Sequence, residues 1–130
     1  MFATKEEIKE MLQKIKEEAP IIVVEGKKDR AALEAFQIKN IIILNGKDIW
    51  NRIEQTVEET GKNTRSKQEK EFLILTDFDK KGKELYGKIA KNLDKLGAKI
   101  NKEYREFFQK KTKLSHVEGI VTYVKNLDEK

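Results

Sequence analysis

The chain has 130 residues, a formal net charge of +5 and no cysteine. This length predicts a single domain with a sizeable core. The lack of cysteine excludes disulfides, thiolate zinc sites and cysteine nucleophiles, and the lone His116 excludes a multi-histidine site.

The charged side chains, 39% of the residues, are spread along the chain, and lysine, glutamate and isoleucine are abundant. That composition is typical of a heat-adapted source. The basic balance favours a polyanionic partner, although a lysine-rich, heat-adapted chain is basic whatever it binds. No apolar stretch approaches the ~20 residues of a membrane span, and Met1 leads into a charged segment rather than a signal peptide. We therefore expect a cytoplasmic protein with no membrane contact.

The first predicted element is an amphipathic helix over residues 5–18. Thr4 and Glu7 have the spacing of a capping box, and apolar side chains then recur at helical spacing until Pro20 stops the helix. The apolar positions are Ile8, Met11, Leu12 and Ile15. Residues 1–19 are thus expected to form a helical unit that either packs on the sheet or mediates homodimerisation.

Three apolar runs predict the strands of one sheet, at residues 21–25, 41–44 and 71–76. Each run is continuous rather than alternating, which is typical of strands buried on both faces of a parallel sheet. Residues 98–100 are expected to add a short fourth strand.

Helices are predicted between and after these strands. Their ranges are 29–36, 48–59 ended by Gly61, 81–96 ended by Gly97, and 117–127, with a polar surface loop at 62–70. The alternation indicates an α/β domain over residues 20–100, in which a central parallel sheet of about four strands is flanked by helices. Residues 101–130 are expected to form a C-terminal helical extension packed on the same domain.

Acidic side chains follow two of the predicted strands. Glu25 closes the first apolar run, and Asp77 and Asp79 follow the third in the sequence TDFDKKG. Ligands of a parallel sheet bind at the carboxyl ends of its strands, where Asn45 and Gly46 also lie. Crowded carboxylates repel one another unless a cation or a proton is present, and Mg²⁺ takes one or two carboxylates together with phosphate oxygens. The residues therefore predict a magnesium site for phosphate chemistry.

The residue pattern leaves several individual roles open. Glu25 either completes the metal shell or acts as a general acid or base. Asp79 is also placed to cap the helix that starts near Lys80, and Asp29 is placed as a helix cap or as an outer acid of the site. His116 is expected at a helix start or on the surface rather than in catalysis.

Taken together, these motifs resemble the Toprim domain. The stretch IVVEGKKDRAAL, the strand ending in Asn45-Gly46 and the stretch ILTDFDKKG occur in the Toprim order. They are most similar to the Toprim domains of primase and of the ribonuclease that matures 5S ribosomal RNA. The size of the chain resembles the small stand-alone Toprim proteins of archaea and thermophilic bacteria.

The resemblance implies a Rossmann-like fold with an acidic site formed by Glu25, Asp77 and Asp79. It implies Mg²⁺, with Mn²⁺ as a possible substitute, bound mainly by the aspartates. It also implies that Glu25 is the general base in strand joining and the general acid in strand cleavage. Three loop glycines are expected to allow close backbone approach, namely Gly26, Gly46 and Gly82.

Lysines next to these motifs are candidates for phosphate contact. They are Lys27, Lys47, Lys80 and Lys81. Trp50 is expected in the core, and Phe78 is a candidate for stacking on a base.

The chain departs from the larger Toprim enzymes, which limits what the resemblance implies. It has no room for the separate tyrosine-bearing domain of topoisomerases, for the zinc- and helicase-binding domains of primases, or for the C-terminal domain of the rRNA-maturing ribonuclease. Its own tyrosines are expected to pack within helices, at Tyr86, Tyr104 and Tyr123.

The sequence therefore leaves three functions open. The first is Mg²⁺-dependent phosphotransfer on nucleic acid, as in a nuclease acting on structured RNA or DNA ends. The second is a non-catalytic module that binds nucleic acid or nucleotide and acts as an accessory to a larger replication, repair or RNA-processing complex. The third is an enzyme with a mononucleotide substrate.

Overall fold

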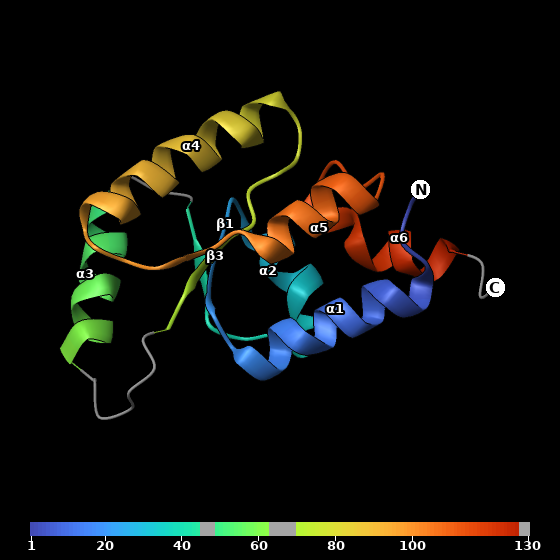
Figure 1. Cartoon of the computed structure of the whole chain (residues 1–130), viewed down its shortest axis with the longest axis horizontal. Coiled ribbons are helices and arrows are strands. Elements are labelled where there is room, and N and C mark those ends of the chain that lie inside the picture. The colour runs from blue at the N-terminus through green and yellow to red at the C-terminus, as the bar shows by residue number, and fades with distance from the viewer. Residues whose placement is uncertain (45–48, 63–69, 128–130) are drawn as a thin grey trace.

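A four-stranded parallel sheet forms the centre of the computed structural model, which describes residues 1–44, 49–62 and 70–127 (Figure 1). The strand order is β2-β1-β3-β4. The strands span Ile21–Val24 (β1), Ile41–Ile43 (β2), Phe72–Ile74 (β3) and Ile100–Asn101 (β4). The predicted α/β fold with a parallel sheet of about four strands is confirmed.

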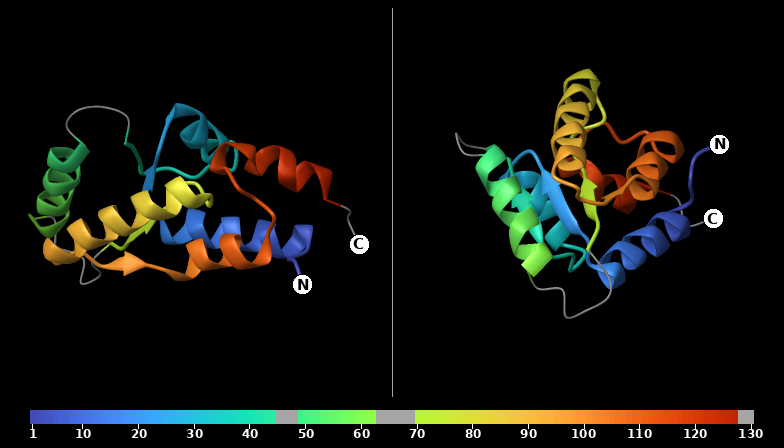
Figure 2. Two further views of the ribbon diagram at one scale, coloured as in Figure 1. Left: turned by 90° about the horizontal axis from the view of Figure 1, so that it is seen from above. Right: turned by 60° about the vertical axis from the view of Figure 1, so that its left-hand side comes forward.

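Helices cover both faces of this sheet (Figures 1 and 2). One face carries α1 (Lys5–Glu18), α2 (Lys27–Glu34), α5 (Glu103–Lys111), the 3-10 turn η1 (Val117–Gly119) and α6 (Ile120–Asn126). The other face carries α3 (Ile49–Lys62) and α4 (Lys80–Lys95).

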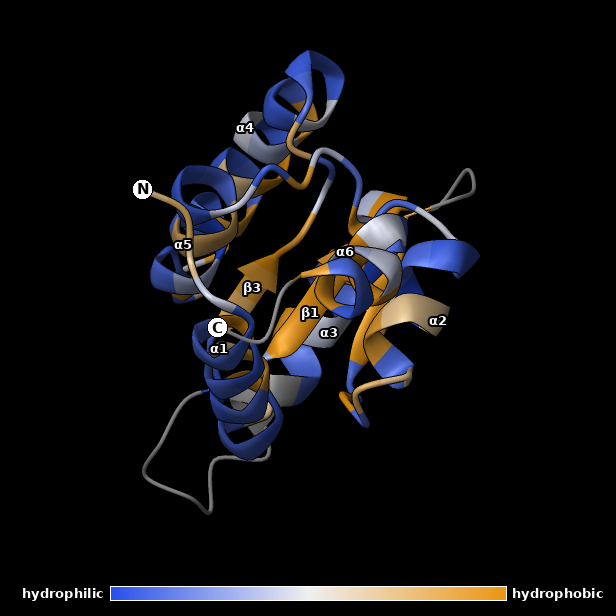
Figure 3. Cartoon of the chain, turned by 90° about the vertical axis from the view of Figure 1, so that its right-hand side faces the viewer, coloured by the Kyte–Doolittle hydropathy of each residue, from blue (hydrophilic) through white to orange (hydrophobic). Residues whose placement is uncertain are grey.

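Alternation along the central strands explains the two hydrophobic cores. Ile22 and Val24 of β1 point into the first core, whereas Ile21 and Val23 point into the second. Both sets are buried, which is why the run is continuously apolar. Colouring by hydropathy shows apolar strands in the middle and hydrophilic outer surfaces on the helices (Figure 3).

The first helix has the bounds that the sequence predicts. The Thr4 hydroxyl accepts from the Glu7 N–H at 3.1 Å, the Glu7 carboxylate accepts from the Thr4 N–H at 3.0 Å, and Ala19 ends the helix in a left-handed conformation. Its apolar stripe is buried in the core of the same chain. The helix therefore packs on the sheet, the first of the two expected arrangements.

Several details differ from the prediction. Helix α2 starts two residues earlier than predicted, α3 continues through Gly61, and the expected C-terminal helical extension contains a separate helix, α5, for which no bounds were predicted. Trp50 is 40% exposed, so its assignment to the core was wrong. The side chains of α3 that pack against the sheet are Ile49, Ile53 and Val57, which are spaced four residues apart, and Trp50 is not among them. The loop expected at 62–70 falls mostly outside the described residues.

Among the described residues, no helix is long and apolar enough to cross a membrane.

Candidate metal centre and acidic site

The acidic residues follow two neighbouring strands. Strands β1 and β3 pair in parallel, so the residues that follow them leave the sheet at the same edge. The Glu25 carboxylate Oε2 accepts from the backbone N–H of Asp77 at 2.7 Å. This hydrogen bond joins the ends of the two strands and places two of the three acids side by side.

Each aspartate also accepts one backbone hydrogen bond. Asp77 Oδ1 accepts from the N–H of Val117 at 3.0 Å. Asp79 Oδ1 accepts from the N–H of Gly82 at 2.8 Å and caps α4, as one of the two roles suggested for it. Capping uses one oxygen only, and Asp79 Oδ2 lies 3.4 Å from Nε2 of His116.

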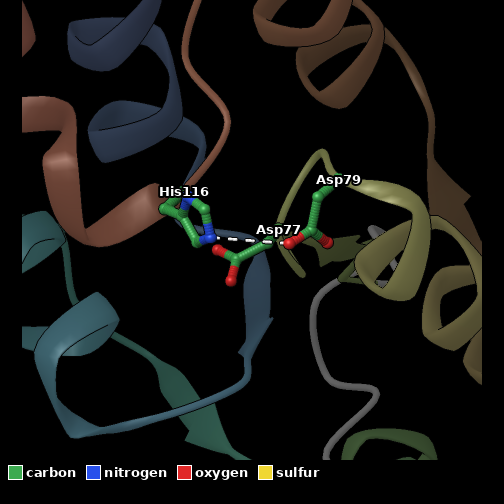
Figure 4. Close-up of side chains that lie close together, drawn as sticks. All are labelled: Asp77, Asp79 and His116. Atoms are coloured by element: carbon green, nitrogen blue, oxygen red, sulfur yellow. Dashed lines mark ion pairs between the residues drawn. The ribbon is translucent and has the colours of Figure 1, made fainter.

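The loop between β3 and α4, which carries Asp77 and Asp79, meets the segment before η1, which carries His116 (Figure 4). One ligand atom from each of the three lies within 4.8 Å of the others. The expectation that His116 stands at a helix start is correct, because it precedes η1. Its position beside the aspartates has no signal in the sequence, because 36 residues separate it from Asp79 and no spacing motif links them.

Glu25 lies next to this cluster but outside it. Burial raises the pKa of Glu25, the hydrogen bond from Asp77 offsets part of that rise, and the charges of Asp77, Asp29 and Asp79 add to it. A carboxyl group with a raised pKa holds a proton closer to neutral pH, which suits a general acid or base.

Asp29 turns out to be both a helix cap and an outer acid. Its Oδ2 accepts from the N–H of Gly26 at 3.0 Å, at the start of α2. The side chain is 6% exposed, and burial raises its pKa, with the charge of Asp77 adding to the rise. Asp29 therefore adds negative potential behind the site.

The raised pKa of Glu25 predicts that Glu25→Gln stabilises the metal-free protein near neutral pH. The folded state binds the Glu25 proton more tightly than the unfolded state, so the free energy of unfolding falls as pH rises from the ordinary pKa of 4.5 through the raised value. Glutamine cannot ionise, yet its carbonyl oxygen can still accept from Asp77. Thermal unfolding in EDTA should show the largest gain in melting temperature near pH 7 and a smaller one near pH 4. A gain that increases on acidification would contradict this assignment.

Arg105, a buried residue of α5 that was not predicted from the sequence, supports the site. Its guanidinium donates to the carbonyl oxygens of Ile74 at 3.2 Å, Thr76 at 2.7 Å and Asp77 at 3.0 Å. It also lies over the rings of Phe78 and Tyr86, at 5.0 and 4.7 Å from their centroids. Phe78 is itself buried, so it is not available for stacking on a base. Arg105 thus fixes the backbone from which Asp77 projects.

Gly82 lies where α4 meets the backbone of Asp77. A Cβ atom at this position would lie 1.9 Å from the Asp77 carbonyl oxygen. The Gly82 carbonyl accepts from the hydroxyl of buried Thr76 at 2.7 Å, which holds the contact closed. At Gly26, by contrast, the nearest neighbour of an added Cβ would be 4.0 Å away.

The lysines suggested for phosphate contact are only partly described. Lys27 is exposed at the start of α2, and Lys80 and Lys81 are exposed at the start of α4. Gly46 and Lys47 lie outside the described residues. Contact of these side chains with phosphate remains a prediction.

Comparison with known proteins gives consistent matches. The family model for the Toprim domain matches residues 20–115. A UPF0292 protein of Methanocaldococcus jannaschii is 30% identical over 125 residues, covering 92% of this chain and 91% of that protein. A UPF0292 protein of Thermococcus onnurineus is 30% identical over 97 residues, covering 75% and 66%. A solved structure of a putative protein from Aquifex aeolicus superposes with a TM-score of 0.66 at 27% identity, covering 84% of this chain and 94% of that one.

Proposed function

Because this chain belongs to the Toprim domain family and to the UPF0292 proteins, we propose that it is a divalent-metal-dependent enzyme that cleaves phosphodiester bonds of nucleic acid. The observation that carries the proposal is the convergence of Asp77, Asp79 and His116 beside Glu25, a carboxyl group with a raised pKa. Metal ligands next to a group suited to proton transfer are the components that phosphodiester hydrolysis requires.

The chemistry of the donors supports a divalent cation. One oxygen of Asp77 and one of Asp79 accept backbone hydrogen bonds, and the second oxygen of each carboxylate makes no backbone hydrogen bond within the described residues and can bind a cation. Carboxylate oxygens suit Mg²⁺ and Mn²⁺, and an imidazole nitrogen shifts the preference from Mg²⁺ toward Mn²⁺ and other transition metals. Asp79 and His116 are 43% and 51% exposed, so an ion bound there would remain open to water and to a substrate phosphate.

The metal ligands, Glu25 and the neighbouring lysines would have different roles in the reaction. A bound cation would lower the pKa of a coordinated water and stabilise negative charge on the phosphate. Glu25 holds or releases a proton at Oε1, because its Oε2 is engaged with Asp77. Exposed Lys27 and Lys80, at the starts of the two adjoining helices, attract and orient phosphate oxygens.

Replacing Asp77 by asparagine tests the metal site. We expect at least a tenfold loss of Mn²⁺ affinity, because the variant loses a charged ligand and keeps a similar shape. Titration of Mn²⁺ followed by electron paramagnetic resonance measures the affinity, and Asp94→Asn on the exposed side of α4 is the control with the same change of charge. Equal Mn²⁺ affinity in Asp77→Asn and Asp94→Asn would refute the site.

Cleavage assays separate the enzyme from a binding module. The wild type is incubated with Mg²⁺ or Mn²⁺ and precursor 5S RNA, single-stranded DNA or duplex DNA, and Asp77→Asn should bind the substrate without cleaving it. The openness of the cluster also suits a non-catalytic module that holds nucleic acid through a metal. Salt-sensitive binding without cleavage by the wild type would favour that second function.

A further inference from the structure

A groove of about 460 Å³ runs along the outer edge of the sheet, between α2 on one face and α3 on the other. Its floor is the edge strand β2, residues Ile41–Ile43. Its walls carry polar and charged side chains: Lys27, Arg30, Arg52, Gln55, Thr56 and Glu59. No role in this groove was expected for Arg30 or Arg52.

The cations of the groove gather at the end nearest the acidic site. Lys27 follows Glu25 by two residues, and Arg30 stands one turn further along α2. Arg52 donates to the carbonyl oxygen of Ile43, the last residue of β2, at 3.3 Å. Among the described residues that line the groove the one acid is Glu59, which lies about two turns along α3 from Arg52, toward the opposite end. The groove therefore carries a net positive charge that is concentrated beside the strand tips.

The edge strand adds backbone groups to this surface. Asn40 and Leu44 bond to β1 through their backbone groups, so the alternation of a parallel ladder turns the N–H and C=O groups of Ile41 and Ile43 toward the outer edge, where Arg52 covers the Ile43 carbonyl. Arg30 pairs with Glu34 at 3.7 Å on an exposed helix face, a contact weak enough to exchange for a phosphate. Cationic side chains and outward N–H groups together match the oxygens of a phosphodiester chain.

We propose that this groove binds the phosphodiester backbone of a single-stranded segment of the nucleic acid, adjacent to the bond held at the acidic site. Lys27, Arg30 and Arg52 are its phosphate contacts. A pocket of this volume matches a small ligand rather than a duplex, and proteins track single strands through basic grooves. The proposal rests on the proposed function, whose site it extends.

Binding of labelled oligo(dT) and oligo(U), measured by fluorescence anisotropy in EDTA, tests the groove without the metal. Arg30→Gln and Arg52→Gln should each weaken binding about fivefold and lower the salt slope by about 0.7. Lys91→Gln, which removes an exposed charge on α4, should leave affinity and slope close to the wild type. Glu59→Gln should strengthen binding, because it removes a negative charge from the wall of the groove.

Two further measurements keep the test decisive. Arg52→Lys retains the charge and should bind nearly as the wild type, which separates loss of phosphate contact from loss of the bond to Ile43. Equal affinity for the DNA and RNA probes would show that the groove contacts the phosphates alone. A higher affinity for RNA would show that it also contacts the ribose 2′-hydroxyl.

The experiments distinguish a wrong proposal for the groove from a wrong proposal for the function. One outcome is that Arg30→Gln and Arg52→Gln bind oligonucleotides as tightly as Lys91→Gln does, while the wild type cleaves nucleic acid and Asp77→Asn does not. In that case the groove does not bind nucleic acid, and the proposed function stands. If the wild type binds neither probe and cleaves no nucleic acid, both proposals are overturned.

Discussion

Gly82→Ala is expected to destabilise the protein by about 3 kcal/mol, a large effect for the addition of one methyl group. The added Cβ would lie 1.9 Å from the carbonyl oxygen, 2.4 Å from the carbonyl carbon and 2.8 Å from the Cα of Asp77. These are backbone atoms of Asp77, whose N–H donates to Glu25 and whose carbonyl oxygen accepts from Arg105. They cannot rotate away as a flexible side chain would, so relief requires α4 to move away from the site.

A second glycine of the same helix provides the control. Gly87 is exposed, and an added Cβ there would meet nothing within 4 Å. Gly87→Ala should therefore stabilise the protein by about 0.5–1 kcal/mol through helix propensity. Urea unfolding of the two variants in EDTA measures the difference. The structure would be wrong at this contact if Gly82→Ala unfolded within about 0.5 kcal/mol of the wild type.

Moving α4 would also affect the site, because Asp79 is bonded to the N–H of Gly82. Gly82→Ala should therefore weaken Mn²⁺ binding at temperatures where the variant is folded, whereas Gly87→Ala should leave it unchanged. Glycine at this position thus has a defined physical role: it allows the first turn of α4 to touch the strand exit that carries Asp77.

The fold could be predicted because its strands are short-range features of the sequence. A continuous run of β-branched residues such as 21–24 has few alternatives to a buried parallel strand. Placing Glu25 and Asp77 directly after such runs put them at one edge of the sheet, where the hydrogen bond between them is found. That part of the site could be predicted because neighbouring parallel strands end at the same edge of the sheet, whatever the chemistry of the side chains that follow them.

The remainder of the site depends on tertiary contacts without a local pattern. Arg105 is one of many cations on helices, and only the path of α5 across the end of β3 turns it inward. His116 reaches Asp79 because the segment before η1 returns to the site, as the bond from Val117 to Asp77 shows. Trp50 was placed wrongly for a related reason: whether a side chain of α3 is buried depends on which face of the helix meets the sheet, and Ile49, Ile53 and Val57 form that face.

Arg105→Met is the second substitution for which we expect a large effect, a loss of about 3–5 kcal/mol in the free energy of unfolding. The side chain is 4% exposed and satisfies three carbonyl oxygens around the exit of β3. Burial lowers the pKa of Arg105, and the charges of Glu25 and Asp77 counteract that shift. Methionine would fill part of the space but leave those carbonyls without donors, and Glu25 and Asp77 without a nearby cation.

Urea unfolding in EDTA and Mn²⁺ titration at a temperature where every variant is folded separate stability from positioning. Arg105→Lys keeps the positive charge and one donor group, so it should be more stable than Arg105→Met. Its gain in Mn²⁺ affinity over Arg105→Met should be smaller, because an ammonium group cannot reach all three carbonyl oxygens. Lys102→Met, an equal loss of charge at an exposed position nearby, should leave both quantities close to the wild type. If Arg105→Met matched Lys102→Met in stability and Mn²⁺ affinity, the buried arginine would have no part in holding the site. Because the loss of a nearby cation alone would favour Mn²⁺ binding, a fall in Mn²⁺ affinity in the order wild type, Arg105→Lys, Arg105→Met would show that the arginine acts by holding the backbone that carries Asp77.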